Sequence, residues 1–279
     1  MTPHYTGHRA PFIDAHVHIR DARGLDAVQA AGVVAVRDAG IRENRLSQSR
    51  AFDHHNARPV VVSALWAIYK KDGYGSVFGA AVENRDELSS EITRLAQAGA
   101  DIIKVMASGM VSLHEPGTVT AGGFSEEELR FIVHEAGKAR LGVMAHANGE
   151  NAIIAAARAG VRSIEHGFFM TEAALEVMAE AKTFWVPTIG ALTRAAQAAT
   201  LSKQMREYIE ALLHSHLAMI LKAHSIGVPL AVGTDCVLPD SEYGNKYDTE
   251  LSYFEQAGIA RQDVIHLACD GGARLLGIT

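Results

Sequence analysis

The sequence is poor in cysteine and has no long apolar run. Its 279 residues include only two cysteines, Cys236 and Cys269, which are too few for a disulfide framework and fit a reducing compartment. Apolar runs such as 33–36 fall far short of the roughly 18 residues that a membrane span requires. The first twelve residues do not resemble a cleavable signal. We therefore expect a cytoplasmic protein that does not associate with membranes.

Concentrated positive charge and the common nucleotide-binding motifs are also missing. The formal net charge is -6, and Lys70-Lys71 is the main basic cluster, whereas phosphate binding needs concentrated cationic side chains. Neither a G-x-G-x-x-G turn opening a helix nor a G-x-x-x-x-G-K-[ST] loop occurs. These features argue against a nucleic-acid partner and favour a small-molecule substrate.

Hydrophobic patterning predicts alternating strands and helices along the whole chain. Short runs rich in β-branched residues indicate strands at 12–19, 33–39, 59–66, 101–108, 143–147, 163–167, 184–190 and 229–235. Segments with helical spacing lie at 85–99, 125–142 and 151–160. This alternation is typical of β-α units and of a parallel sheet.

The number of units predicts a (β/α)₈ TIM barrel. Eight strands in 279 residues give about 35 residues per unit, close to the usual barrel repeat. We expect one domain over 1–279, because no Pro- or Ser-rich linker divides the chain. An open doubly wound sheet would show the same alternation, so the strand count alone does not establish closure.

Local signals indicate where helices begin and end. Ser125 followed by Glu128 predicts a capping box at the start of a helix. The segment 200–226 is long for one helix, and we expect a helix with a loop excursion there. Left-handed helix ends are expected at Gly99, Gly142, Gly160 and Gly227.

The strongest chemical signal is a pair of histidines in the first expected strand. His16 and His18 are two residues apart, a spacing that places both side chains on one face of a strand. Both imidazoles could bind one metal ion. Asp14 shares that face, and we expect it to support the imidazoles by hydrogen bonding.

Four further polar residues lie in or at the ends of later strands. They are Lys104, His146, His166 and Asp235. An unpaired charge on the inner face of a barrel strand is costly unless a metal or a countercharge compensates it. In a closed barrel the carboxyl ends of all strands meet at one mouth, where barrel enzymes place their active sites. We therefore predict one shared site.

The ordered set His16-x-His18, Lys104, His146, His166 and Asp235 resembles the amidohydrolase superfamily of metal-dependent hydrolases. More narrowly, VVAVRDAG, ADIIKVMASG, SEEELRFIVHEA, SIEHG and GTD are similar to the imidazolonepropionase-like and Xaa-Pro dipeptidase-like branch. The similarity extends from about residue 11 to residue 278.

This resemblance implies a binuclear metal site. His16, His18 and Asp235 would hold the more buried cation and His146 and His166 a second one. Lys104, carboxylated by CO₂, would bridge the two cations. Zinc is the expected metal, with manganese or cobalt as substitutes.

The resemblance also implies an activity. A hydroxide activated by the metals would attack an amide-type bond in an N-acyl amino acid, a dipeptide or a cyclic amide. Asp235 would act as the general acid and base.

The sequence departs from its relatives in several loops. Relatives usually carry a small β-sandwich on both flanks of the barrel, and we expect most or all of it to be absent here. Asn148 stands where a second histidine is common. Loop residues expected to contact the substrate are Tyr69, Lys70, Tyr74, Tyr243 and, as the first choice, His114. The remaining nine histidines and Cys236 are expected to lie on the surface or in packing contacts.

Other functions stay open at this point. The same site could hydrolyse a lactone, a carbamate or another ester, or act as a metal-dependent lyase such as a decarboxylase. A mononuclear deaminase would leave Lys104 without a task. A catalytically silent barrel is the non-enzymatic alternative, although it would have no use for Asp235. A homo-oligomer is expected because a barrel without its flanking domain exposes apolar helix surface.

Overall fold

The computed structural model describes residues 11–42, 59–198 and 200–278. Ten strands lie in this part of the chain, and every pairing between them is parallel. They are β1 (Phe12–Ile19), β2 (Val33–Asp38), β3 (Val60–Ser63), β4 (Ala67–Lys70), β5 (Gly79–Val82), β6 (Ile102–Met106), β7 (Gly142–Ala147), β8 (Ser163–His166), β9 (Phe184–Val186) and β10 (Cys236–Leu238).

The strands form two sheets that hydrogen bonds join on both sides. Their orders are β10-β1-β2-β3 and β5-β4-β6-β7-β8-β9. Between β3 and β6, the Asp101 N–H donates to the Ser63 carbonyl at 2.9 Å. On the other side the segment 229–235 lies between β9 and β1. The Ala231 N–H donates to the Trp185 carbonyl (3.1 Å), and the Ala15 N–H donates to the Val232 carbonyl (2.8 Å). The strands therefore close into a ring.

Three of the expected strands differ from the prediction. The strand expected at 184–190 ends at Val186, and a helix begins at Ile189. The range 59–66 was expected to be one strand, but it ends at Ser63 and the chain continues as β4 after a break at 64–66. The expected strand at 229–235 has only an isolated bridge, between Trp185 and Leu230, and irregular backbone elsewhere. Its strand geometry is interrupted where Asp235 adopts a left-handed conformation (φ 53°).

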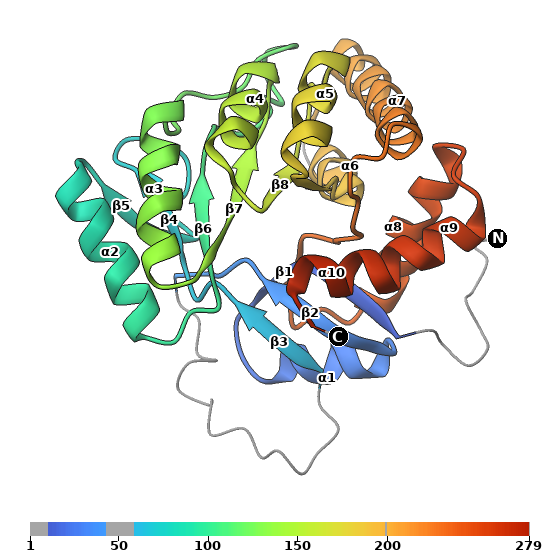
Figure 1. Cartoon of the computed structure of the whole chain (residues 1–279). Helices are drawn as coiled ribbons and strands as arrows, with labels where there is room; N and C mark the ends of the chain where they lie inside the picture. Colours follow the sequence, from blue (N-terminus) through green and yellow to red (C-terminus); the bar gives the residue numbers. More distant parts are fainter. Residues whose placement is uncertain (1–10, 43–58, 199, 279) are drawn as a thin grey trace.

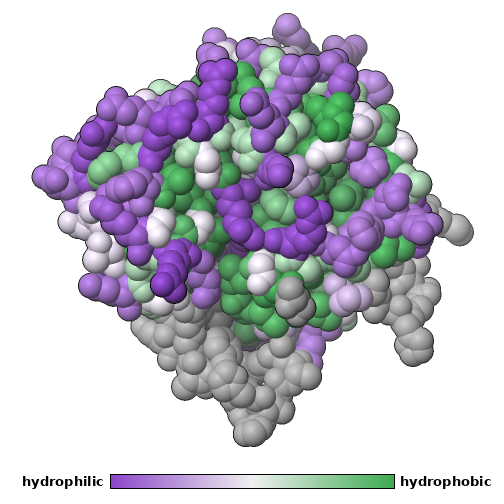
Figure 2. All heavy atoms as spheres, in the orientation of Figure 1, coloured by the Kyte–Doolittle hydropathy of each residue, from purple (hydrophilic) through white to green (hydrophobic). Residues whose placement is uncertain are grey.

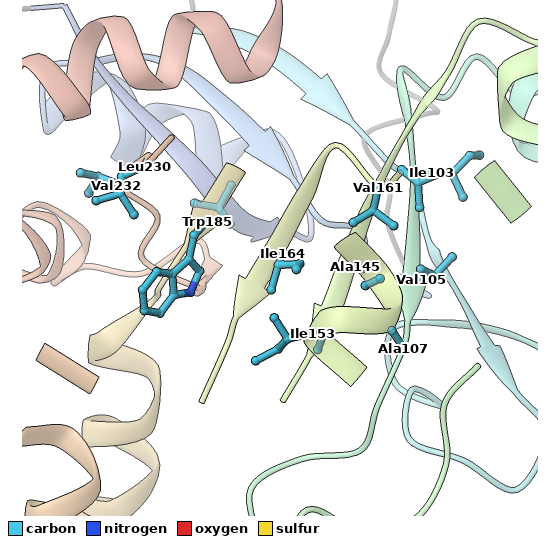
Figure 3. Packing of buried hydrophobic residues seen from close by; sticks show 14 of the residues in the cluster. Ile103, Val105, Ala107, Ala145, Ile153, Val161, Ile164, Trp185, Leu230 and Val232 are labelled. Carbon is cyan, nitrogen blue, oxygen red and sulfur yellow. The ribbon is translucent and has the colours of Figure 1, made fainter. Parts of the chain in front are cut away.

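Alternation along each strand separates an outer apolar layer from the barrel interior. Ile103 and Val105 of β6 belong to the main hydrophobic cluster beneath the helices, whereas Lys104 between them points inward. Figure 3 shows this outer layer across β6, β7 and β8, where Val105, Ala145 and Ile164 lie near Ile153 of α4. Lys104 therefore reaches the cavity, while its two neighbours pack under the helices.

Helices cover the outside of the barrel, and α2, α3, α4 and α5 follow one another along it (Figure 1). The helices are α1 (Arg23–Ala30), α2 (Arg85–Gln97), α3 (Glu126–Lys138), α4 (Glu150–Ala159), α5 (Glu172–Ala181), α6 (Ile189–Ala198), α7 (Lys203–Ser225), α8 (Tyr243–Gln256), α9 (Arg261–His266), the π-helix η2 (Leu267–Gly271) and α10 (Gly272–Leu276). The segment 200–226 holds the single helix α7, so the expected loop excursion is wrong.

The helix-end predictions are confirmed except at one glycine. Ser125 and Glu128 form the capping box of α3. Gly99, Gly160 and Gly227 have positive φ, but Gly142 starts β7 and Arg140 takes the left-handed position instead (φ 59°).

Within the described ranges, no helix combines the length and apolar character needed to cross a bilayer. Hydrophilic residues cover much of the face seen in Figure 2, and hydrophobic residues show between them near its centre.

The amino ends of the strands are closed by the C-terminal helices. Gly272 of α10 lies so close to β1 that a Cβ atom there would come within 2.7 Å of Ile13 Cβ. Arg162, just before β8, donates to the Leu275 carbonyl at 2.6 Å. The opposite, carboxyl end of the barrel is left for the site.

We expect Gly272→Ala to lower the free energy of unfolding by about 1–3 kcal/mol, because the added methyl group overpacks the contact with Ile13. The control is Gly137→Ala on α3, where nothing lies within 4 Å of the new Cβ. This control should raise stability by about 0.5–1 kcal/mol, since alanine is the better helix former. Urea unfolding followed by circular dichroism measures both changes, and equal shifts for the two variants would contradict the packing described here.

Candidate active site

A cavity of about 180 Å³ opens at the carboxyl ends of the barrel strands. All six residues predicted as metal ligands line it: His16, His18, Lys104, His146, His166 and Asp235. They come from β1, β6, β7, β8 and the segment 229–235 directly before β10. Strands far apart in the sequence thus deliver their polar side chains to one point.

Three of these residues are close enough to share one cation. Ligand atoms of His16, His18 and Asp235 lie within 4.8 Å of one another. Asp235 Oδ1 is 3.1 Å from His18 Nε2 and 3.4 Å from His16 Nε2. The His166 ring lies beside this group, with its centroid 5.1 Å from that of His16 and 4.5 Å from that of His146.

Each imidazole is held at one nitrogen by the protein. His16 Nδ1 is 2.6 Å from Glu165 Oε2, and His18 Nδ1 is 2.6 Å from the Gly40 carbonyl. His166 Nδ1 is 2.7 Å from Thr188 Oγ1. His146 is held at the other nitrogen, with Nε2 3.0 Å from the Gly109 carbonyl. The second nitrogen of each ring is therefore left for a ligand.

Two buried polar atoms in the site have no hydrogen-bond partner in the part of the chain that the structure describes. They are His16 Nε2 and Lys104 Nζ. Lys104 is 1% exposed, and burial lowers the pKa of its amine from 10.5 to about 8, against the opposing charges of Glu165 and Asp235. A part of this amine is thus neutral near pH 8 and can react as a nucleophile.

Burial also keeps His16, His146 and His166 neutral. It lowers the pKa of His16 to about 4 and that of His146 to about 3, and the nearby Lys104 charge acts in the same direction. The pKa of His166 is held well below 6.5, mainly by burial and then by the charge of His146. Neutral imidazoles are the form that binds metals.

Asp235 stays ionised in this setting. Burial acts to raise its pKa, but the hydrogen bond with His18 and the neighbouring His16 and His166 together hold that pKa well below 3.8. Its backbone, like that of His166 (φ 66°), is left-handed. Such conformations are strained for residues with side chains and turn these two inward at the strand ends.

A buried ion pair lies directly behind His16. Arg37 Nη2 lies 2.9 Å from both carboxylate oxygens of Glu165, and Ser163 also donates to this carboxylate. Burial raises the pKa of Glu165, but the charge of Arg37 and the hydrogen bond with His16 outweigh it and bring that pKa to about 2. Glu165 is therefore a carboxylate that accepts from His16.

The sequence assigned that supporting role to Asp14, and this assignment is wrong. Asp14 accepts from the backbone N–H of His16 (3.1 Å) and from Thr234 and Tyr243 (2.7 and 3.0 Å). It stabilises the backbone of β1 and the segment before Asp235, and no hydrogen bond joins it to either imidazole among the described residues.

Glu165 escaped the sequence reasoning because of its place beside His166. Adjacent residues of a strand face opposite sides, so a ligand at His166 suggested an outward Glu165. The left-handed turn at His166 cancels this alternation. An apolar strand carrying Glu beside His was the available signal.

Of the residues expected to contact the substrate, one lines the cavity and the others do not. Tyr74 lines the cavity, with its ring centroid 5.0 Å from that of His146. His114 and Tyr69 are not among the residues that line it. Tyr243 is buried and its hydroxyl donates to Asp14, while Lys70 pairs with Glu128 at 2.7 Å.

Asn148 joins the loops around the cavity. Its Nδ2 is 3.2 Å from both His146 Nε2 and the Gly109 carbonyl, and its Oδ1 accepts from the Phe168 N–H at 3.0 Å. The remaining wall is apolar and was not foreseen as a cavity surface: Phe78, Met106, Met110, Val111, Leu113, Phe168, Ala191, Leu192 and Ala195.

Of the remaining histidines, His134 and His266 are exposed on helices. His216 packs between Phe168 and Trp185, so these three fit the expected surface or packing roles. His4, His8, His54 and His55 lie outside the described residues. The Cys236 thiol is buried in the main hydrophobic cluster, as predicted.

The donor set fits divalent cations. It combines four imidazoles, one carboxylate and a partly neutral amine around a buried centre, and imidazole and carboxylate are ligands typical of zinc. A cation in this centre would give the unpartnered His16 Nε2 a partner.

Sequence comparison gives a family match and several relatives, among them an ochratoxinase. The model described as "Amidohydrolase family" matches residues 10–279. Ochratoxinase from Aspergillus niger is 36% identical over 152 residues, which cover 54% of this chain and 32% of that protein. The chain thus matches about a third of the length of this relative.

Solved structures share the fold over nearly the whole chain. An Xaa-Pro dipeptidase with bound methionine in its active site gives a TM-score of 0.81 at 24% identity, covering 96% of this chain and 75% of the dipeptidase. The crystal structure of A. niger ochratoxinase gives 0.80 at 23% identity, covering 95% and 71%. The predicted α/β barrel is confirmed.

One buried carboxyl group outside the cavity binds the first turn of helix α6. Ala191 and Leu192 of this helix line the cavity. Glu250 of α8 accepts from the backbone N–H groups of Ile189 (2.7 Å) and Gly190 (2.9 Å). Burial raises its pKa from 4.5 to about 8, although these two hydrogen bonds oppose the shift. The carboxyl group is therefore largely protonated at neutral pH.

This raised pKa predicts a pH dependence of stability. Between pH 4.5 and 8 the folded state binds one more proton at Glu250 than the unfolded state, so the free energy of unfolding falls as the pH rises, by up to about 1.4 kcal/mol per unit. Glu250→Gln should remove this fall. Urea unfolding of both proteins from pH 5 to 8 measures it, with Glu210→Gln on α7 as the control for lost charge. Parallel pH profiles for wild type and Glu250→Gln would contradict the prediction.

Proposed function

Because the chain belongs to the amidohydrolase family, as its motifs predicted, we propose that it is a metal-dependent hydrolase that cleaves an amide-type carbon–nitrogen bond. The substrate class is an N-acyl amino acid, a dipeptide or a cyclic amide. The names of an ochratoxinase and an Xaa-Pro dipeptidase among its relatives support this class.

One observation carries the proposal. Six side chains from five separate parts of the barrel meet in one cavity, and each of the four imidazoles has one nitrogen tied to the protein. A packing role alone would leave His16 Nε2 and Lys104 Nζ buried without partners at a cost. A binding scaffold has no need of this arrangement.

We assign His16, His18 and Asp235 to one cation and His146 and His166 to a second. The neutral amine of Lys104 would add to CO₂ and release a proton, and the resulting carbamate, with one negative charge shared by two oxygens, would be the bridging group. When bound, divalent cations act as Lewis acids and lower the pKa of water.

The protein's own groups then move the proton and orient the substrate. The ionised Asp235 accepts a proton from the attacking water and returns it to the leaving amine, general acid–base work usually worth about 10²- to 10⁴-fold. Burial raises the pKa of Tyr74 well above 10, so its phenol keeps its proton and can donate a hydrogen bond in the cavity. The apolar wall formed by residues such as Phe168 and Leu192 excludes bulk water.

Metal analysis combined with a substrate panel tests this function. The panel should contain N-acyl amino acids, an Xaa-Pro dipeptide, ochratoxin, a cyclic amide, and matching esters and lactones. We expect bound zinc, manganese or cobalt and hydrolysis of amides that a chelator abolishes and added metal restores. A protein with no metal and no turnover would instead be a silent barrel, and turnover of esters alone would move it to the alternative class.

Lys104→Ala tests the bridging role. We expect this variant to lose the second metal and most activity, because no anionic group remains between the two sets of ligands. A short carboxylate such as propionate should restore part of both. Atomic absorption and amide hydrolysis measure the outcome, with Lys138→Ala on the exposed face of α3 as the control. Unchanged metal content in Lys104→Ala would count against bridging.

A further inference from the structure

We propose that Glu165, anchored by Arg37, is the positioning residue that fixes the ring of His16 and raises the metal affinity of the site. This inference rests on the proposed metal-dependent function. It assigns a role to two buried residues that touch neither the cavity nor the substrate.

The contact between Glu165 and His16 Nδ1 leaves His16 Nε2 for the cavity side. Glu165 Oε2 lies 2.6 Å from His16 Nδ1. An ionised carboxylate can only accept, so Nδ1 carries the proton and Nε2 keeps its lone pair. That Nε2 is the buried atom without a hydrogen bond, 3.4 Å from Asp235 Oδ1. The carboxylate therefore selects the tautomer that binds a cation on the cavity side.

Arg37 holds the carboxylate in place from a third strand. Its Nη2 lies 2.9 Å from both oxygens of Glu165, its Nη1 donates to Ser163 Oγ (2.8 Å), and its Nε donates to the Ala15 carbonyl (2.7 Å). Arg37, Glu165 and His16 are all 0% exposed. The guanidinium thus connects β1, β2 and β8 close to His16 of β1 and His166 of β8.

An ion pair that only stabilises the fold and one that positions His16 predict different effects on metal binding when both partners are replaced. Buried ion pairs can often be replaced by neutral or apolar side chains of similar volume without loss of stability. If the pair served stability alone, replacing both partners would leave the metal site intact. If Glu165 positions His16, the same replacement should still weaken metal binding.

The experiment measures zinc affinity of the full chain by competition with a chromophoric chelator, alongside urea unfolding of the metal-free protein. The variants are Glu165→Gln and the double variant Arg37→Met with Glu165→Gln. The matched control is Glu135→Gln on α3, another glutamate replaced by an amide, which pairs with Lys138 and accepts from Ser89.

We expect Glu165→Gln to weaken zinc binding about 10- to 100-fold and to destabilise the protein, because Arg37 loses its countercharge. The double variant should regain stability while its zinc affinity stays low. Glu135→Gln should bind zinc within about twofold of wild type, against that 10- to 100-fold loss. If Glu165→Gln does not fold, the double variant alone decides.

Two results would overturn the inference. One is wild-type zinc affinity in the double variant, which would make the pair structural only. The other is wild-type affinity in a folded Glu165→Gln. A wild-type protein that binds no zinc, manganese or cobalt would instead contradict the proposed function, so the two failures are distinguishable.

Discussion

Polar atoms that are buried in a barrel must be satisfied, and this constraint determines the whole site. The outer face of each strand is apolar and packs beneath helices, so polar side chains such as Lys104 are directed inward. Carboxylate, carbonyl and hydroxyl groups behind the rings satisfy one nitrogen of each imidazole. On the cavity side, His16 Nε2 and Lys104 Nζ have no hydrogen-bond partner among the described residues. A cationic centre is the simplest way to satisfy them together.

Local strain helps to place these groups. His166 and Asp235 both have left-handed backbones at the point where their strands end. Gly233, just before Asp235, has no room for a side chain, because a Cβ there would lie 2.8 Å from His16 Cβ. The strain and the close approach are compensated by the tightly packed interior around them, a pattern that is common at functional sites.

The sequence predicted which polar side chains meet in the cavity, but not the residues behind them. Their role as metal ligands stays a prediction. His16, His18, Lys104, His146, His166 and Asp235 could be found because strand ends of a barrel converge, whatever the details of each strand. Arg37 and Glu165 could not, since they depend on which residue interrupts strand alternation. Asp14 was given the role of Glu165 for the same reason. Tyr243, His114 and Tyr69 were chosen from loops, whose paths depend on side-chain packing and are not encoded by periodicity. The single domain and the homo-oligomer stay predictions.

Hydrophobic patterning also did not predict where the strands are interrupted. The chain stops pairing after Ser63 and resumes as β4, and 229–235 bonds to its neighbours without a regular ladder. Short apolar runs do not show such breaks.

The most direct test of the metal centre is anomalous diffraction at the zinc absorption edge from crystals of the zinc-loaded protein. The account predicts two peaks, one among His16, His18 and Asp235 and one beside His146 and His166, with carbamate density on Lys104 between them. Density for an unmodified Lys104 amine and no anomalous peak in the cavity would contradict it.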